Sequence, residues 1–296
     1  MGDYDRDGDL DIFVCNYLYN QTVLYDSAGN AVGFRPDGLP DYGVLADWSY
    51  SHALLYLTRR PVMVSSFGTP EALRQNREAY RILLDEPEER AFQSLRRNRI
   101  RYLVISELIS GVERMARLAG IDGSFMREHE STEPPGRIEF IPTFRFARSL
   151  YARLFLADGS ASSLFEATLE PLSHFRLCLD SQRLLLLFQR TMPEYRLFEA
   201  VAGATLAGRA EPGQAIQLRL DLRTNFGRPV RYQAETTADP DGRFSLVVPY
   251  PTRGWSAPIQ VLTPYRIKIG DRLISVEVPE EAVVGGATVP VPEAPV

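Results

Sequence analysis

The chain has 296 residues, of which 45% are hydrophobic and 24% charged; these are ordinary values for globular proteins and exclude wholesale disorder. A chain of this length is expected to form two domains with a terminal appendage. The formal net charge of −5 argues against nucleic acid as a partner. No apolar run approaches the ~20 residues that span a bilayer, and no signal peptide is recognisable at the start.

Residues 1–41 are predicted to be a separate acidic segment. Aspartates occupy alternate positions around Gly8, and a strand-like Ile-Phe-Val run follows: Asp3, Asp5, Asp7, Asp9 and Asp11. Alternating carboxylates on a tight loop can surround a Ca²⁺ ion with oxygen ligands, and without a cation they would repel one another. We therefore expect a calcium loop in which four aspartates bind through their side chains and Asp9 through its backbone carbonyl.

The spacing of these aspartates resembles the calcium loop of FG-GAP/VCBS-type β-propeller repeats. The resemblance covers about twenty residues, and a propeller needs roughly four to eight blades, so we interpret the segment as an incomplete repeat. Two alternatives remain open, namely an acidic solvated turn and a damaged remnant that binds calcium weakly.

Residues 42–194 are predicted to form a mixed α/β domain. Thr69 is suited to cap a helix that begins at Pro70, a second helix is expected after Pro87, and a third over residues 107–118 should end at Gly120. A short helix is expected over residues 149–156.

Strands of this domain are predicted from runs of apolar residues. The sequence IRYLVIS at 100–106 is typical of a buried strand. Further strands are expected at residues 54–57, 62–65, 174–179 and 183–188. Residues 121–146 contain a Pro-Pro-Gly breaker and are predicted to be a loop.

Residues 195–284 are predicted to be an all-β sandwich, because segments of alternating hydrophobicity are separated there by Gly- and Pro-bearing turns. The sequence Asp239-Pro240-Asp241-Gly242 is interpreted as a tight hairpin turn. Residues 285–296 are rich in Pro, Gly and Val and are predicted to be a flexible tail.

The densest cluster of aromatic and polar residues lies at 44–68, where the sequence ADWSYSH resembles the WWDYG motif of oligosaccharyltransferase catalytic subunits. The segments RRPV, RYLVIS, SLYARLF, LSHFRLCLDS and YRLFEAVAGATL follow in an order similar to that of the soluble C-terminal domain of those proteins. The resemblance covers roughly residues 42–206.

This resemblance implies that Trp48, Ser49 and Tyr50 bind an acceptor peptide, because the motif in that family recognises the hydroxyl of the sequon's Ser or Thr. Trp48 and Tyr50 match the motif, whereas Asp47, Ser49 and Ser51 replace its first tryptophan, its aspartate and its glycine. A serine lacks the charge-assisted acceptor of a carboxylate, which is roughly twice as strong as a neutral one. Asp47 could supply a carboxylate from the neighbouring position. The alternative is that Trp48 and Tyr50 are buried anchors of the core.

Catalysis in that family depends on a multi-pass membrane portion, so we assign no catalytic residue and predict that the isolated chain does not transfer glycans. We expect the soluble, extracytoplasmic, acceptor-peptide-binding portion of an oligosaccharyltransferase-like glycosyltransferase, whose partners are an acceptor peptide or protein and a membrane-embedded portion. One alternative is a calcium-dependent extracytoplasmic interaction module of FG-GAP/VCBS type. Another is a fusion of a propeller fragment with a glycosyltransferase tail.

Overall fold

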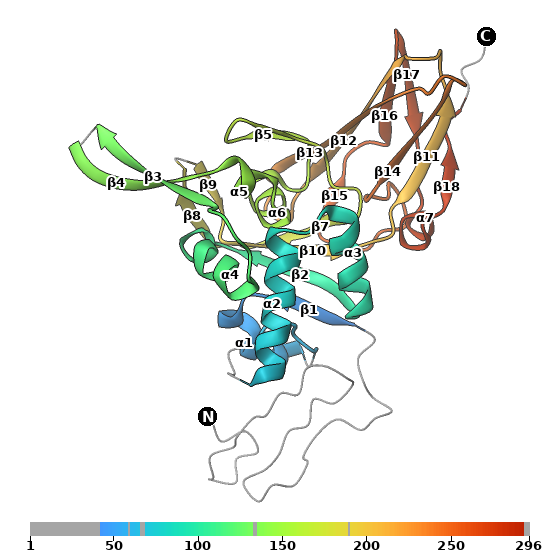
Figure 1. Ribbon diagram of the computed structural model, residues 1–296. Coiled ribbons are helices and arrows are strands. Elements are labelled where there is room, and N and C mark those ends of the chain that lie inside the picture. Colours follow the sequence, from blue (N-terminus) through green and yellow to red (C-terminus); the bar gives the residue numbers. More distant parts are fainter. Residues whose placement is uncertain (1–41, 59, 66–68, 133–134, 189, 293–296) are drawn as a thin grey trace, which may run out of the picture.

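The computed structural model describes residues 42–58, 60–65, 69–132, 135–188 and 190–292. These residues form an α/β part, built around a four-stranded sheet, and a two-sheet part that follows it in the chain (Figure 1). Helices together with several β-sheets were predicted, and this mixture is confirmed. The aspartates of the predicted calcium loop, Asp3 to Asp11, lie outside the described residues, so that loop stays a prediction.

The central sheet of the α/β part has the strand order β1-β2-β10-β7. Its strands are β1 (Gly43–Ala46), β2 (Ile100–Ser106), β10 (Tyr195–Ala200) and β7 (Phe175–Asp180). β1 is parallel to β2, and β10 is antiparallel to both β2 and β7. The predicted strand at 100–106 is therefore confirmed in the interior of the sheet, where Leu103 is fully buried.

The strand β10 corrects a prediction, since Tyr195–Ala200 was expected to open the β-sandwich. It instead lies between β2 and β7, with Phe198 fully buried. Hydrophobic alternation shows that a segment can be a strand, but it does not show which sheet the strand joins. The first sheet therefore extends to Ala200, one strand beyond the predicted boundary at 194.

Helices pack on this sheet and on one another (Figure 1). They are α2 (Pro70–Leu84), α3 (Glu88–Arg97), the 3₁₀ turn Ile109–Gly111, α4 (Val112–Ala119), α5 (Phe144–Arg148) and α6 (Leu150–Ala157). Thr69 caps α2 by accepting the backbone N–H of Ala72 at 3.2 Å. Gly120 ends α4 in the left-handed conformation, with φ of 67°. Both helix ends agree with the prediction.

Three local predictions in the α/β part are wrong. Residues 62–65 do not form a strand, since Val62 makes only an isolated bridge with Val44. Residues 54–57 belong to α1 (Trp48–Thr58) and not to a strand, because a short apolar run has no period that separates the two structures. Residues 121–146 contain a hairpin of β3 (Met126–Thr132) and β4 (Pro135–Pro142), which projects from the body (Figure 1). A Pro-Pro-Gly sequence marks a turn, and a turn can join two strands as well as interrupt them, so it did not exclude a hairpin here.

Two smaller hairpins complete the α/β part. They are β5 (Ser162–Leu164) with β6 (Ala167–Leu169), and β8 (Leu184–Leu187) with β9 (Arg190–Pro193). The second of these confirms the strand predicted at 183–188. In the part of the chain that the structure describes, every helix is too short or too polar to span a lipid bilayer.

The two-sheet part has one sheet with the order β13-β12-β16-β17, to which β15 adds beside β12, and a second sheet with the order β14-β11-β18. The strands of the larger sheet are β12 (Ala215–Arg223), β13 (Pro229–Thr237), β15 (Gln260–Val261), β16 (Tyr265–Ile269) and β17 (Arg272–Val276). Those of the smaller sheet are β11 (Ala204–Arg209), β14 (Arg243–Val248) and β18 (Thr288–Pro290), and α7 (Glu280–Gly285) precedes β18. β18 pairs in parallel with β11, so residues 288–290 are an ordered strand and not part of the predicted flexible tail.

Two buried ionic clusters, which we call the seam, join the α/β part to the two-sheet part. In the first, Arg176 of β7 donates to Glu199 of β10 at 2.7 Å and to Glu280 of α7 at 2.6 Å, and its guanidinium lies over the ring of Trp255. Arg101 donates to the other oxygen of Glu199 at 2.7 Å. The side chains of the first cluster therefore come from both parts.

The second cluster of the seam centres on Arg228, in the turn between β12 and β13. Its guanidinium donates to Asp158 at 2.7 Å and to Asp180 at 2.8 Å, so both carboxylates of the α/β part are held by one arginine of the two-sheet part. Arg196 of β10 lies 3.2 Å from Asp158. Removing one partner of such a pair strongly destabilises the folded protein, because the other charge is then buried without a partner.

Candidate peptide-binding surface

The three residues assigned to peptide binding lie in the first turn of α1, directly after β1. Asp47 is the N-cap of this helix: its Oδ1 accepts the backbone N–H of Ser49 at 3.0 Å and the hydroxyl of Ser49 at 2.5 Å. The backbone carbonyl of Asp47 accepts the N–H of Tyr50 and the hydroxyl of Ser51, both at 3.0 Å. The chain turns from strand to helix at this point because Asp47 satisfies donors that the first turn leaves free.

The residues in the first turn of α1 differ in exposure. Trp48 is 42% exposed, so the alternative that it is a buried anchor is wrong. Ser49 is exposed and Tyr50 is half-buried, whereas Ser51 is fully buried against the core. A tryptophan, a serine hydroxyl and a tyrosine thus lie side by side along the chain at the surface.

Tyr50 connects this turn to residues that are distant in sequence. Burial raises the pKa of its hydroxyl, and the negative charges of Glu194 and Asp47 raise it further, while Arg183 lowers it. Glu194 and Arg183 lie at the base of the β8–β9 hairpin and form an ion pair at 3.2 Å. Glu194 and Arg183 were not predicted as part of the site, because no motif spacing links positions that are more than 130 residues from Tyr50.

The remainder of α1 is apolar and partly exposed. Tyr56 is 63% exposed and Leu57 is 76% exposed, two turns beyond Trp48. The β8–β9 hairpin also exposes Leu184 and Leu186. Large exposed apolar side chains of this kind often mark surfaces that contact another molecule.

The polar groups of this surface can form hydrogen bonds to a ligand, but they do not form a metal centre. No group of three His, Cys, Asp or Glu side chains in the described part of the chain is arranged to hold a metal ion. The hydroxyl of Ser49 already donates its hydrogen to Asp47, so its oxygen lone pairs remain free to accept one. The surface combines aromatic faces with a polarised hydroxyl, which suits the binding of a peptide.

A family match falls on the two-sheet part of the chain. Residues 203–289 match the sequence profile described as the archaeal glycosylation protein B long peripheral domain. No curated protein matches the sequence significantly. The family resemblance therefore reaches beyond residue 206, into the part that the motif did not cover.

Several solved structures share the fold of this chain. The oligosaccharyltransferase AglB from Archaeoglobus fulgidus, in complex with an inhibitory peptide and a dolichol-phosphate, is 18% identical with a TM-score of 0.68, and the match covers 90% of this chain and 39% of that one. A complex of the Archaeoglobus fulgidus oligosaccharyltransferase with Zn and sulfate has 18% identity, a TM-score of 0.67, and coverage of 90% and 42%. Another, tethered to an acceptor peptide with an NVT sequon, has 17% identity, a TM-score of 0.67, and coverage of 90% and 40%.

The predicted resemblance to the soluble domain of oligosaccharyltransferases is thus confirmed, by the fold over most of the chain and by the family match at 203–289. This chain spans about two fifths of the length of these solved structures.

Proposed function

We propose that this chain is the soluble, acceptor-peptide-binding portion of an oligosaccharyltransferase-like enzyme, and that it acts beside a membrane-embedded catalytic portion in an extracytoplasmic compartment. The observation that carries the proposal is the fold shared with the archaeal oligosaccharyltransferase over 90% of the chain. That enzyme has been solved with an inhibitory peptide and a dolichol-phosphate, and with a tethered sequon peptide. The family match at residues 203–289 supports the proposal independently.

The first turn of α1 is the proposed peptide site. The Ser49 hydroxyl donates to Asp47 at 2.5 Å, and this bond polarises the Ser49 oxygen toward accepting a second hydrogen bond. The hydroxyl of a sequon Ser or Thr would donate to that oxygen, while Trp48 and Tyr50 contact the apolar parts of the peptide. Asp47 therefore acts through Ser49, in place of the motif's own aspartate.

The exposed apolar side chains of α1 are proposed to face the membrane-embedded portion. Tyr56 and Leu57 lie on the same helix as the peptide site, so one element would position the peptide and contact the partner. Burying such side chains would contribute roughly 25 cal/mol for each Å² of apolar surface removed from water.

A peptide titration tests the site. An Asn-X-Thr peptide is titrated against the purified chain by fluorescence anisotropy, with Trp48→Ala and Ser49→Ala as test variants. Each is expected to weaken binding at least about fivefold, since the few residues that dominate an interface cost more than ~1 kcal/mol when truncated. Leu57→Ala, on the same helix and 76% exposed, is the control and should bind as the wild type does.

A second peptide isolates the hydroxyl contact. An Asn-X-Ala peptide should bind the wild type more weakly than Asn-X-Thr, whereas Ser49→Ala should bind the two peptides equally, because the interaction is then already lost. If the wild type and both variants bind the two peptides with equal affinity, the proposal that this turn binds the sequon is wrong.

We propose calcium as the ligand of the acidic segment that begins the chain. Calorimetric titration with Ca²⁺ is expected to release or absorb heat that is lost in Asp5→Ala and in Asp7→Ala, because each variant removes a charged oxygen ligand. Asp271→Asn, which changes an exposed carboxylate elsewhere, is the control. If no binding is measured below millimolar Ca²⁺, the proposal that this segment binds calcium is wrong.

A further inference from the structure

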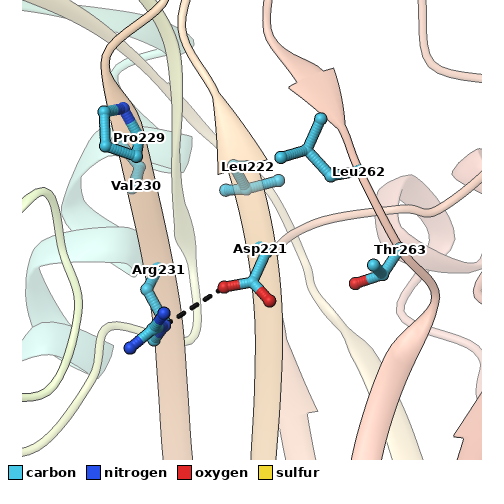
Figure 2. A pocket seen from close by; sticks show the side chains of 7 residues that line it. All are labelled: Asp221, Leu222, Pro229, Val230, Arg231, Leu262 and Thr263. Atoms are coloured by element: carbon cyan, nitrogen blue, oxygen red, sulfur yellow. Dashed lines mark hydrogen bonds and ion pairs between the residues drawn. The ribbon is translucent and has the colours of Figure 1, made fainter.

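The two-sheet part contains a hollow of about 460 Å³, formed where the chain passes from β15 to β16 (Figure 2). β15 pairs with β12 at Leu222 and Arg223, and β16 resumes pairing with β12 only at Arg219. Leu262 still donates its backbone N–H to the carbonyl of Asp221 in β12 at 3.0 Å, and Thr263 follows it before β16 begins, so both residues border the hollow. The hollow is therefore built into the sheet by an irregularity in strand pairing.

A carboxylate held by two guanidinium groups lines this hollow. Asp221 of β12 is directly opposite Arg231 of β13 in the strand register and accepts its Nε at 3.1 Å. Arg219 donates to the same carboxylate at 2.9 Å. Burial alone would raise the pKa of Asp221, but the hydrogen bonds from Arg219 and Arg231 outweigh burial and lower it, so the group stays ionised. The three side chains together carry one net positive charge.

Thr263 faces this carboxylate across the hollow. Figure 2 shows the hydroxyl of Thr263 and the carboxylate of Asp221 turned toward each other. The Oγ1 atom of Thr263 is buried and has no hydrogen-bond partner among the described residues. Buried polar atoms in proteins are almost always hydrogen-bonded, so an atom of this kind that lines a hollow points to a ligand or an ordered water.

Apolar groups complete the walls of the hollow. Leu262, which is 46% exposed, and Pro229 lie on its rim, and Val230 and Leu222 line it further in. Ligand sites typically combine apolar walls with a few polar groups that fix orientation. A carboxylate that accepts, a guanidinium that donates and a free hydroxyl, set beside apolar side chains, complement the hydroxyl groups and the C–H face of a sugar ring.

We propose that this hollow binds one pyranose residue of a glycan, with a preference for an acidic sugar. Neighbouring sugar hydroxyls donate to Asp221 and accept from Arg231, a further hydroxyl pairs with Thr263, and the ring packs against Leu262. The excess positive charge of the two arginines favours a sugar carboxylate. This site does not depend on the peptide site in α1.

Saturation-transfer NMR with the purified full chain tests the proposal, using methyl glucuronide and methyl glucoside as probes. Both sugars are expected to show transfer, with the glucuronide bound more tightly. Thr263→Val, which keeps the shape of the side chain, should weaken binding of both about fivefold through loss of one hydrogen bond. Arg231→Met should remove the preference for the acidic sugar.

Thr237→Val, an exposed threonine of β13 outside the hollow, is the matched control and should bind as the wild type does. Circular dichroism establishes that each variant is folded. Absence of transfer at millimolar sugar, or equal binding by Thr263→Val and the wild type, overturns the proposal. Because no sequon peptide is present, either result leaves the peptide site untouched.

Discussion

The seam and the first turn of α1 both contain buried carboxylates, but the hydrogen-bond donors of these carboxylates differ between the two regions. In the seam, Glu199 is held by Arg176 and Arg101, which come from other strands, and Glu280 joins from the two-sheet part. In α1, Asp47 is held by the N–H and hydroxyl of Ser49, two residues away. The long-range pairs fix two parts of the molecule together, whereas the local pair leaves the adjacent aromatic side chains free for a ligand.

The largest expected effect is in the first cluster of the seam. Arg176→Ala should lower the free energy of unfolding by about 3–5 kcal/mol, because Glu199, whose side chain is 4% exposed, would lose its main buried partner. Arg101→Ala removes the donor to the other oxygen of the same carboxylate, but the Arg101 side chain is 46% exposed, so the loss should stay below ~1 kcal/mol. Urea unfolding measures both. Equal losses of unfolding free energy in the two variants would show that the burial of an arginine does not decide how much it stabilises the fold.

The second cluster of the seam should make stability depend on acid. Burial raises the pKa of Asp158, but Arg196 and Arg228 outweigh burial and hold it below its ordinary value. A carboxyl with a lowered folded-state pKa contributes stability that is fully present above its unfolded pKa of ~3.9 and lost as the pH falls through the folded value. Asp158→Asn should lower the free energy of unfolding by about 1.5–3 kcal/mol at pH 7, because the hydrogen bonds to the ionised carboxylate are lost.

Unfolding curves between pH 7 and pH 2 test this dependence. The difference between wild type and Asp158→Asn should shrink as the pH falls below ~3.9, because the unfolded wild-type chain then binds a proton that the native Asp158 does not, and it should reach its minimum once the pH is below the folded-state pKa. Asp271→Asn, in an exposed hairpin turn, serves as the control and should follow the wild type. A difference that stays constant over this range would mean that the charge of Asp158 does not stabilise the fold.

The contrast between local and long-range pairing also explains what the sequence could predict. The caps at Thr69 and Gly120 were predictable, because each depends on residues within a few positions of one another. The helix α1 was not predicted, although the hydrogen bond that Asp47 accepts from Ser49 is equally local, because the short apolar run that follows is compatible with a strand as well. The seam was not predictable, because Arg176 lies 23 residues from Glu199 and 104 from Glu280, and no local pattern joins these positions.

The errors in strand prediction have the same physical origin. The β3–β4 hairpin is stabilised by pairing between its two strands. Ile138 and Phe140 alternate with charged residues in β4, but β3 is almost wholly polar and the Pro-Pro-Gly sequence indicated a loop. Tyr195–Ala200 has the alternation of a strand, but its partners β2 and β7 are fixed by the packing of the whole sheet. The hollow beside Thr263 likewise depends on the register between β12 and β16, which the sequence does not encode locally.

Two substitutions of Asp47 separate its two roles. Asp47→Ala removes the N-cap and should cost about 1 kcal/mol, while Asp47→Asn keeps a cap of similar strength. Both variants lose the charge that polarises Ser49, so both should weaken binding of an Asn-X-Thr peptide, although only the alanine variant loses stability. Urea unfolding and fluorescence anisotropy together distinguish the outcomes. Wild-type affinity in Asp47→Asn would mean that Asp47 only caps the helix, and that Ser49 binds the peptide without its charge.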